Sequence, residues 1–382
     1  MHPRPASLLI RRFLLNIMIK TLNLFLLSLF LLNSFYTAFP FATHNNYSSS
    51  ATDSTSFPGK IVITGVGDIM LGSAFPDSRI LPPSDNPFLL LACVADTLSS
   101  SDITFGNLEG SFLDSGEPWK KCRDTTICYL FRMPERYVSA LTSSGFDILS
   151  VANNHFGDFG PPGRTKTKQI LDSVGIKYAG LVEHPWSIFR KDSILYGFCA
   201  FAPNSGTVNL NETEKAAAIV RMLADTCDIV IVSFHGGAEG ADFQHVPRVA
   251  EVFHGENRGD VYLFAHTMID NGADVVFGHG PHVTRAIEVY RDRFISYSMG
   301  NFCTYGRINL AGPNGLAPII KISVDTTGKF LSGRIIPVYQ TWPGGVKYDY
   351  NRRVISKIRA LMDADFPDAL IDLSVNGEIS YK

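Results

Sequence analysis

Five short apolar runs in this chain each end in polar residues of kinds that bind metal ions. The clearest covers residues 275–283, where a β-branched run stops at Gly278 and presents the imidazoles of His279 and His282. The other runs cover residues 61–68, 103–109, 148–155 and 229–235. Such runs predict buried strands. Since ligands of open α/β sheets bind at the carboxyl ends of parallel strands, we expect these polar side chains to meet in one place.

Helical patterns alternate with these runs, which predicts an α/β fold with a largely parallel sheet. The expected helices cover residues 86–99, 134–144, 161–174, 213–224 and 259–271. After residue 286 the pattern changes to strand-like runs joined by turns, over residues 286–290, 294–297, 318–324 and 330–339. These runs predict antiparallel strands on a second sheet, followed by a helix over 354–362.

The N-terminal region is typical of an exported protein. Basic residues precede an apolar run over 21–32, which predicts a signal peptide or a retained membrane anchor within residues 1–42. Residues 43–59 are rich in Ser, Thr and Asn and predict a disordered linker. We therefore expect a periplasmic or secreted protein, or one anchored at the cell envelope, whose membrane contact is confined to this segment. A net charge of −2 gives no overall basic field and argues against nucleic acid as a partner.

Six cysteines are then interpreted for an oxidising compartment. Cys122 and Cys128 lie close together in a polar segment, and a local disulfide is the simplest interpretation, with two free thiols as the alternative. The remaining four lie in apolar segments and are expected to be buried small hydrophobes: Cys93, Cys199, Cys227 and Cys303.

The residues that follow the strands form a set of carboxylates, amides and imidazoles. In chain order they are Asp68, Asn107, Glu109, Asn153, Asn154, His155, Asp158, His235, Glu239, His279 and His282. Such ligands suit Mn, Fe or Zn, and two ions would use more of them than one. Each motif alone has an ordinary alternative, such as a turn at Gly67-Asp68 or a helix cap at Glu109. Arginines near the motifs can receive an anionic substrate or simply be solvated: Arg132, Arg164, Arg285 and Arg307.

Six motifs in order carry a family resemblance. They are Gly67-Asp68, Gly106-Asn107-Leu108-Glu109, Asn153-Asn154-His155 with Asp158, His235-Gly236-Gly237-Ala238-Glu239, Gly278-His279-Gly280-Pro281-His282 and Tyr297-Ser298-Met299-Gly300-Asn301-Phe302. This series resembles the CapA family of poly-γ-glutamate capsule biosynthesis, which is similar in turn to calcineurin-like metallophosphoesterases. The resemblance implies a metallophosphoesterase-like layered α/β/β/α sandwich over residues 60–345, with the metal site at the carboxyl ends of the strands. A C-terminal helix and tail over 346–382 would pack on the same domain.

The resemblance also assigns roles by position. It implies that two divalent ions are held by Asp68, Glu109, Asn154, His235, His279 and His282. His155 would protonate a leaving group and Asp158 would orient it, although Asp158 is interpreted equally well as a helix-capping residue. The supporting residues would be Asn107, Asn153, Glu239 and Asn301.

Two departures from the wider phosphoesterase pattern bear on activity. Asp68 is followed by Ile69-Met70, so the customary histidine two residues on is missing, and an extra residue separates the last two histidines. Two functions remain open. One is a metal-dependent hydrolase or transferase of the envelope, which would act on an anionic polymer or phosphoester through metal-bound hydroxide. The other is a non-catalytic factor that binds or exports poly-γ-glutamate. Either could work with other membrane proteins of capsule synthesis.

Overall fold

The computed structural model describes residues 59–121, 129–306 and 308–382. The predicted signal or anchor over 1–42, the linker up to residue 58 and the pair Cys122 and Cys128 lie outside these residues. Within the described ranges, no helix combines the length and apolar character needed to cross a membrane.

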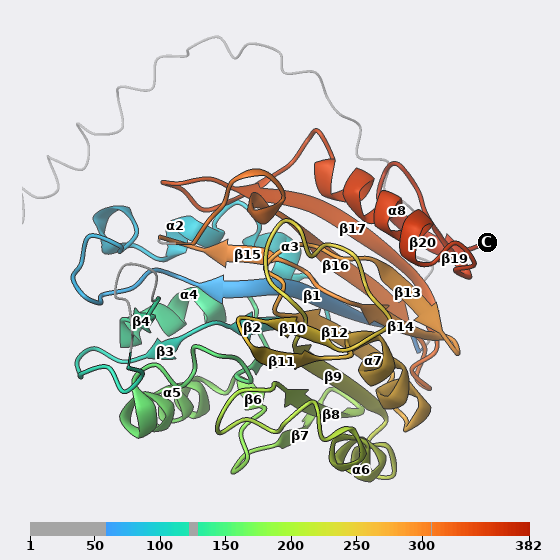
Figure 1. The fold of residues 1–382 in the computed structure, drawn as a ribbon, viewed down its shortest axis with the longest axis horizontal. Helices are drawn as coiled ribbons and strands as arrows, with labels where there is room; N and C mark the ends of the chain where they lie inside the picture. Colours follow the sequence, from blue (N-terminus) through green and yellow to red (C-terminus); the bar gives the residue numbers. More distant parts are fainter. Residues whose placement is uncertain (1–58, 122–128, 307) are drawn as a thin grey trace, which may run out of the picture. The chain divides into compact units, whose positions relative to one another are not determined.

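Two β-sheets form the centre of the molecule (Figure 1). The larger contains β1 (Ile61–Met70), β2 (Ile103–Leu108), β5 (Ile148–Ser150), β6 (Lys177–Ala179), β15 (Asn301–Thr304), β16 (Leu316–Val324), β17 (Phe330–Gln340), β18 (Val346–Tyr348), β19 (Ile371–Leu373) and β20 (Glu378–Tyr381). The smaller contains β7 (Trp186–Lys191), β8 (Ile194–Phe201), β9 (Ile229–His235), β12 (Val275–His279), β13 (Ile287–Tyr290) and β14 (Arg293–Ser296). Neighbours β1, β2, β5 and β6 are parallel, as are β8, β9, β12 and β14.

Aromatic side chains fill the space between the sheets, and helices cover the outer faces. Phe105 of β2 stacks on Phe277 of β12 with ring centroids 5.1 Å apart. The larger sheet is covered by α2 (Phe88–Leu91), α3 (Ala95–Ser99), α4 (Val138–Ser143) and α5 (Gly160–Val174). The smaller sheet is covered by α6 (Thr213–Ala224) and α7 (Val261–Asp270). The expected layered α/β/β/α sandwich is therefore confirmed.

The C-terminal strands differ from the prediction. They do not form a second sheet of their own: β16 and β17 join the larger sheet beside β1, whereas β13 and β14 extend the smaller one. Helix α8 (Arg353–Asp365) packs against strands of both sheets, and residues 346–382 belong to the same compact unit as the rest of the described chain.

The helix expected over residues 86–99 is interrupted. It forms the two short helices α2 and α3, which keep Leu90, Val94 and Leu98 buried on the larger sheet. Cys93 lies at the interruption and is exposed, so its predicted burial is wrong, whereas Cys199 and Cys303 are buried as expected. Burial raises the pKa of both buried thiols.

The parallel strands bring their carboxyl ends to one edge of the sandwich, where β1 also meets β15. The amide of Asp68 donates to the carbonyl of Gly300, at 2.9 Å. This approach requires glycine at position 67, because a Cβ there would lie 1.9 Å from the Gly300 carbonyl oxygen. The Gly-Asp motif thus sets a close contact between two strand ends rather than an ordinary turn.

A buried carboxylate at the other end of β12 should make folding stability depend on pH. Asp274 accepts a hydrogen bond from the Val230 amide and pairs with Arg293, yet burial raises its pKa from 3.8 to about 6. Because the folded state binds this proton more tightly, protonation stabilises the fold. This stabilisation is complete below pH 3.8 and is lost as the pH rises through 6.

As the pH is lowered from 7 to 4, we therefore expect the free energy of unfolding of the wild type to rise by about 2–3 kcal/mol relative to that of Asp274→Asn. Urea unfolding of both proteins across this range measures the difference. Parallel pH profiles for the two proteins would contradict the prediction.

Candidate metal centre

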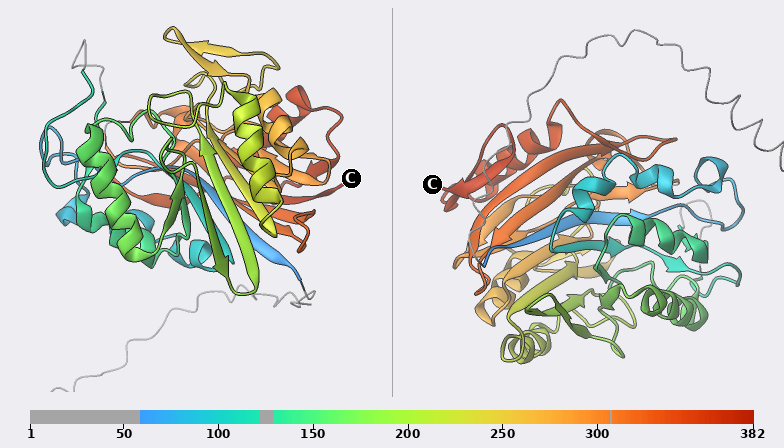
Figure 2. Two further views of the ribbon diagram at one scale, coloured as in Figure 1. Left: turned by 90° about the horizontal axis from the view of Figure 1, so that it is seen from below. Right: turned by 180° about the vertical axis from the view of Figure 1, so that it is seen from behind.

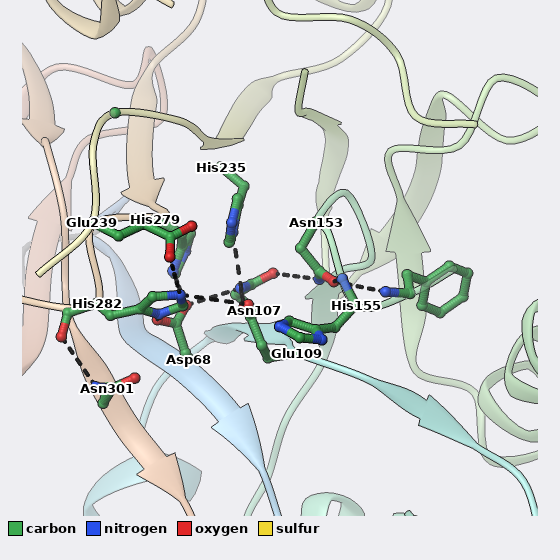
Figure 3. A network of polar contacts seen from close by, with 12 residues as sticks. Asp68, Asn107, Glu109, Asn153, His155, His235, Glu239, His279, His282 and Asn301 are labelled. Carbon is green, nitrogen blue, oxygen red and sulfur yellow. Dashed lines mark hydrogen bonds and ion pairs between the residues drawn. The ribbon is translucent and has the colours of Figure 1, made fainter. Parts of the chain in front are cut away.

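The predicted site residues converge at the carboxyl ends of β1, β2, β9 and β12 (Figure 3). Asp68 and Glu109 come from the larger sheet, whereas His235 and His279 come from the smaller one, and all four are at most 1% exposed. Single ligand atoms of Asp68, Glu109 and His235 lie within 4.8 Å of one another. Four strands of two sheets thus deliver carboxylates and imidazoles to one buried point.

Both imidazoles after β12 contact the Asp68 carboxylate. His279 Nδ1 lies 3.2 Å from Oδ1 of Asp68, and His282 Nδ1 lies 2.8 Å from Oδ2. His282 Nε2 also lies 3.9 Å from Oε1 of Glu109. His282 has a left-handed backbone with φ of 57°, an uncommon conformation outside glycine that turns its ring toward the centre.

Several buried atoms at this point have no hydrogen-bond partner among the described residues. They are Oε1 of Glu109, both ring nitrogens of His235 and Nε2 of His279, and Oδ1 of Asn154, which lines the adjoining cleft, is likewise buried without a partner. Buried polar atoms are rarely left unsatisfied, so each such group needs an explanation. Oxygen and imidazole nitrogen are the donors that Mn, Fe and Zn accept, and the residues present therefore fit a divalent metal.

The charges of the site lead to the same conclusion. Burial alone would raise the pKa of Asp68, but the hydrogen bonds from His279 and His282 outweigh it and hold the pKa well below its ordinary value. Burial, together with the neighbouring Asp68 charge, raises the pKa of Glu109 to about 8. Burial opposes the charged form of His282, yet the hydrogen bond and charge of Asp68 raise its pKa to about 10. The two carboxylates therefore demand compensating positive charge, which a divalent cation can supply in place of protons.

His235 behaves differently. Burial, followed by the charge of Arg258, lowers the pKa of His235 well below its ordinary value. A neutral imidazole is the form that binds metal, so His235 is held ready as a ligand.

A chain of amides supports the ligands. Asn107 Nδ2 donates to Asp68 at 2.9 Å and to Glu109 at 2.5 Å, and Asn153 Nδ2 donates to the Asn107 side chain at 3.1 Å. Asn153 Oδ1 accepts from the amides of His155 and Phe156. These contacts join β2 to the loop after β5 and hold the carboxylates of Asp68 and Glu109 in place.

His155 and Asp158 form a buried pair beside the ligands. His155 Nδ1 lies 2.9 Å from Oδ2 of Asp158, which also accepts from the Phe131 amide at 2.9 Å. Since an ionised carboxylate only accepts, Nδ1 carries the proton of this bond and Nε2 is left for another partner. Asp158 makes no capping bond to α5, so the helix-capping alternative is wrong.

Three further contacts were not anticipated from the sequence. Glu239 pairs with Arg258 at 3.0 Å and lies 4.0 Å from His282 Nε2, and the ring of Phe131 lies against His155 with centroids 4.3 Å apart. Arg258 is on β11 (Glu256–Gly259), far from any motif. Asn301 donates to the carbonyl oxygens of His282 and Asn314 and so holds the His282 loop.

Of the arginines near the motifs, Arg164 lines a cleft of about 700 Å³ that reaches His155 and Asn154. Arg285 is instead fully buried in an ion pair with Glu251, which excludes it as a substrate receptor. Arg132 donates to the carbonyl oxygens of Gly116 and Ala74. Arg307 lies outside the described residues.

Sequence comparison finds similar proteins from two Bacillus species. The chain is 27% identical over 262 residues to the capsule biosynthesis protein CapA of Bacillus anthracis, covering 64% of this chain and 59% of that protein. It is 27% identical over 253 residues to the PGA biosynthesis protein CapA of Bacillus subtilis, covering 62% and 61%. The chain thus spans about three fifths of the length of these relatives.

Solved structures show distant similarity. A putative 5'-nucleotidase from Staphylococcus aureus is 17% identical with a TM-score of 0.44, covering 80% of this chain and 59% of that one. A 5'-nucleotidase precursor from Thermus thermophilus is 11% identical with a TM-score of 0.40, covering 80% and 59%.

The family assignment rests on a broader match. The family described as bacterial capsule synthesis protein PGA_cap matches residues 62–305, which include all the ligand-bearing strands. The resemblance inferred from the six motifs is thereby confirmed. Because this match covers more than half of its length, the chain belongs to the bacterial capsule synthesis protein PGA_cap family.

Proposed function

We propose that this protein is a divalent-metal-dependent hydrolase or transferase of the cell envelope, acting on an anionic polymer or a phosphoester. The observation that carries the proposal is the convergence of Asp68, Glu109, His235, His279 and His282 at one buried point with unpartnered donor atoms. Asn154 completes the set, since its Oδ1 is also buried without a partner at the adjoining cleft. Structural histidines and carboxylates would bond to one another and leave few such atoms free.

The residues would divide the work. A divalent cation held by these ligands would polarise a substrate oxygen and lower the pKa of a coordinated water, and two ions would clamp both reacting oxygens. His155 offers Nε2 to the cleft and would deliver a proton to the departing group. Asp158 fixes the ring orientation and stabilises the charged imidazole, and its burial keeps this hydrogen bond from water.

A role in capsule synthesis is supported by the description of the family and by the relatives named above, which are capsule and PGA biosynthesis proteins. We therefore propose poly-γ-glutamate or a related anionic polymer as one candidate substrate, and other capsule-synthesis membrane proteins as partners. The predicted export signal or anchor over 1–42 would place the described residues outside the cytoplasm.

A second candidate is a non-catalytic envelope factor that binds or exports poly-γ-glutamate. It is favoured by Met70, which stands where a ligand histidine is customary. Met70 is fully buried, and its sulfur accepts a hydrogen bond from the Gly72 amide at 3.3 Å. Position 70 therefore supplies no imidazole to the centre, which leaves a second ion with one ligand fewer.

A metal-binding experiment tests the feature that a hydrolase and a transferase would both require. Asp68→Asn is expected to weaken Mn²⁺ binding at least about tenfold, because loss of residues that only support ligands already weakens metal sites by about 10–100-fold. Calorimetric titration and elemental analysis of the full chain measure this. Asp363→Asn, an exposed aspartate on α8, is the control and should bind as the wild type does.

A wild type that takes up neither Mn²⁺, Zn²⁺ nor Fe²⁺ would exclude the catalytic proposal. If metal binds, a screen of phosphoesters and γ-glutamyl polymers separates the two candidates. Metal-stimulated turnover supports the enzyme, whereas polymer binding without turnover supports the envelope factor.

A further inference from the structure

Two cavities meet at His155, a larger one lined by both polar and aromatic side chains and a smaller one with more apolar walls. The larger is the cleft of about 700 Å³, whose walls include the polar side chains of Asn154, Asn204, Arg164 and Arg258. The smaller, of about 260 Å³, has apolar walls from Phe131, Phe253 and Ile308. His155, Glu239 and Phe253 line both cavities, so the cavities adjoin at the proposed proton donor.

The larger cleft contains a cation suited to an anionic group. Nη2 of Arg164 donates to the Ser205 carbonyl at 2.9 Å, while its Nε is buried without a hydrogen-bond partner in the described chain. Glycine at position 206 leaves room for this guanidinium, because a Cβ there would lie 2.1 Å from Nη1. Burial opposes the charged form of Glu183, but hydrogen bonds and the charge of Lys168 lower its pKa, and the charge of Arg164 contributes to this lowering after them. Oδ1 of neighbouring Asn204 is buried without a partner in the described residues. A guanidinium fixed in a cleft with a free donor favours a carboxylate or phosphate.

Most of the exposed wall of the smaller pocket is apolar, although Glu239, Asn309 and Asn314 also line it. Phe131 is 3% exposed and packs on the His155 ring, and Phe253 is supported edge-to-face by Phe243 at 5.7 Å. The pocket also contains the metal-ligand candidate His282 and Asn301, whose Oδ1 is buried without a partner in the described residues. Apolar walls with a few polar groups are the usual composition of small-molecule sites.

Phe253 reaches the site from a projecting element. It lies on β10 (Glu251–Phe253), which pairs with β11 in a hairpin that stands away from both sheets (Figure 2, left, yellow). Its neighbour Val252 is 65% exposed, so successive residues of β10 point to solvent and to the pocket. The hairpin therefore contributes a further aromatic side chain, beside Phe131, to the wall next to the charged and polar groups of the centre.

We propose that the substrate is amphipathic: an anionic ester or anhydride whose neighbouring group is a single ring or a short branched chain held by Phe131, Phe253 and Ile308. The inference rests on the proposed function and adds the substrate class. A uniformly charged polymer would fill the larger cleft but leave the apolar walls in water. A cavity of about 260 Å³ lies below the range of most drug-sized pockets, so it accepts one ring and not a complete lipid.

A matched pair of probes tests this: phenylphosphonate and methylphosphonate, which share a head group and are not hydrolysed at a P–O ester bond. We expect phenylphosphonate to bind the Mn²⁺-loaded full chain about tenfold more tightly by calorimetry, because its ring is taken out of water. Phe253→Ala should reduce this preference to about twofold while methylphosphonate binding stays unchanged. Val252→Ala is the control and should keep the full preference. Ile308→Ala, on a separate loop, repeats the test if Phe253→Ala does not fold.

The outcomes separate this inference from the proposed function. Equal affinities for the two probes would overturn the amphipathic substrate and leave the metal-dependent enzyme standing. Failure of both probes to bind a chain that has taken up Mn²⁺ would overturn this inference, whereas failure to take up metal at all would overturn the proposed function on which it rests. A tenfold preference that survives in both Phe253→Ala and Ile308→Ala would show that the ring binds elsewhere, which also overturns the assignment.

Discussion

His155→Ala is expected to lower metal-stimulated hydrolysis of a responsive phosphoester by about 10²–10⁴-fold, the range typical for loss of a positioned general acid. The ring is held by Asp158 through Nδ1 and by Phe131 through packing, so its Nε2 keeps a fixed direction toward the cleft. Removing it leaves the ligands in place. Metal affinity should therefore change by less than about threefold, since His155 is not among the atoms that form the buried ligand triad.

The expected loss should appear in kcat at saturating metal, with metal content checked on the same sample. Asp158→Asn should give a smaller loss, because it disturbs the orientation of the ring without removing it. His245→Ala is the control: this exposed imidazole pairs with Asp365 outside the cleft and should leave turnover unaffected. Unchanged turnover in His155→Ala would assign the proton transfer to another group.

Glu251→Ala is expected to destabilise the fold by about 3–5 kcal/mol, because it leaves the charge of Arg285 buried without its partner. The pair is bidentate, with Nη1 and Nη2 of Arg285 lying 2.8 and 2.7 Å from the two carboxylate oxygens. Arg285 is fully buried and Glu251 is 7% exposed, so water cannot replace the lost contact. Glu251 also accepts from the Ala238 amide at 2.9 Å, which ties the hairpin to the loop between His235 and Glu239.

Urea unfolding followed by circular dichroism measures this loss. Glu212→Ala is the matched control, because its exposed pair with Lys215 should contribute less than about 1 kcal/mol. The double variant Glu251→Leu with Arg285→Met should be less destabilised than Glu251→Ala, since it removes both charges. If Glu251→Ala and Glu212→Ala lose equal stability, the buried pair is not a major support of the fold.

The candidate ligand set was predictable because each of its residues lies at or near the carboxyl end of its own strand. A β-branched run, a glycine and a polar residue are neighbours in sequence, so Asp68, Glu109, His235 and His279 could be placed from local patterns alone. Their convergence then followed from the parallel strand order. The helices α5, α6 and α7 were also predicted from local sequence patterns, and each begins and ends within two residues of its expected bounds.

Contacts between distant segments were not predictable in this way. The segment that forms β10 and β11 has no clear alternation, and its position is set by the buried pair of Glu251 with Arg285. The ion pair between Arg258 and Glu239 depends on the position of this hairpin, because Arg258 lies on β11. The division of the C-terminal strands between both sheets has the same cause, since pairing with β1 or β12 depends on partners far away in the chain.

Strand β1 changes partners along one edge, pairing with β16 over its first half and with β15 from Asp68 onward. The connection between β15 and β16 therefore begins and ends on strands that are paired with β1. Ile308 lies within this connection and outside both strands. Substitutions at such positions can change which molecules bind in the proposed pocket, while the Asp68 carboxylate keeps its position. The proposed pocket can thus change its selectivity through that connection without altering the edge that carries the candidate metal ligands.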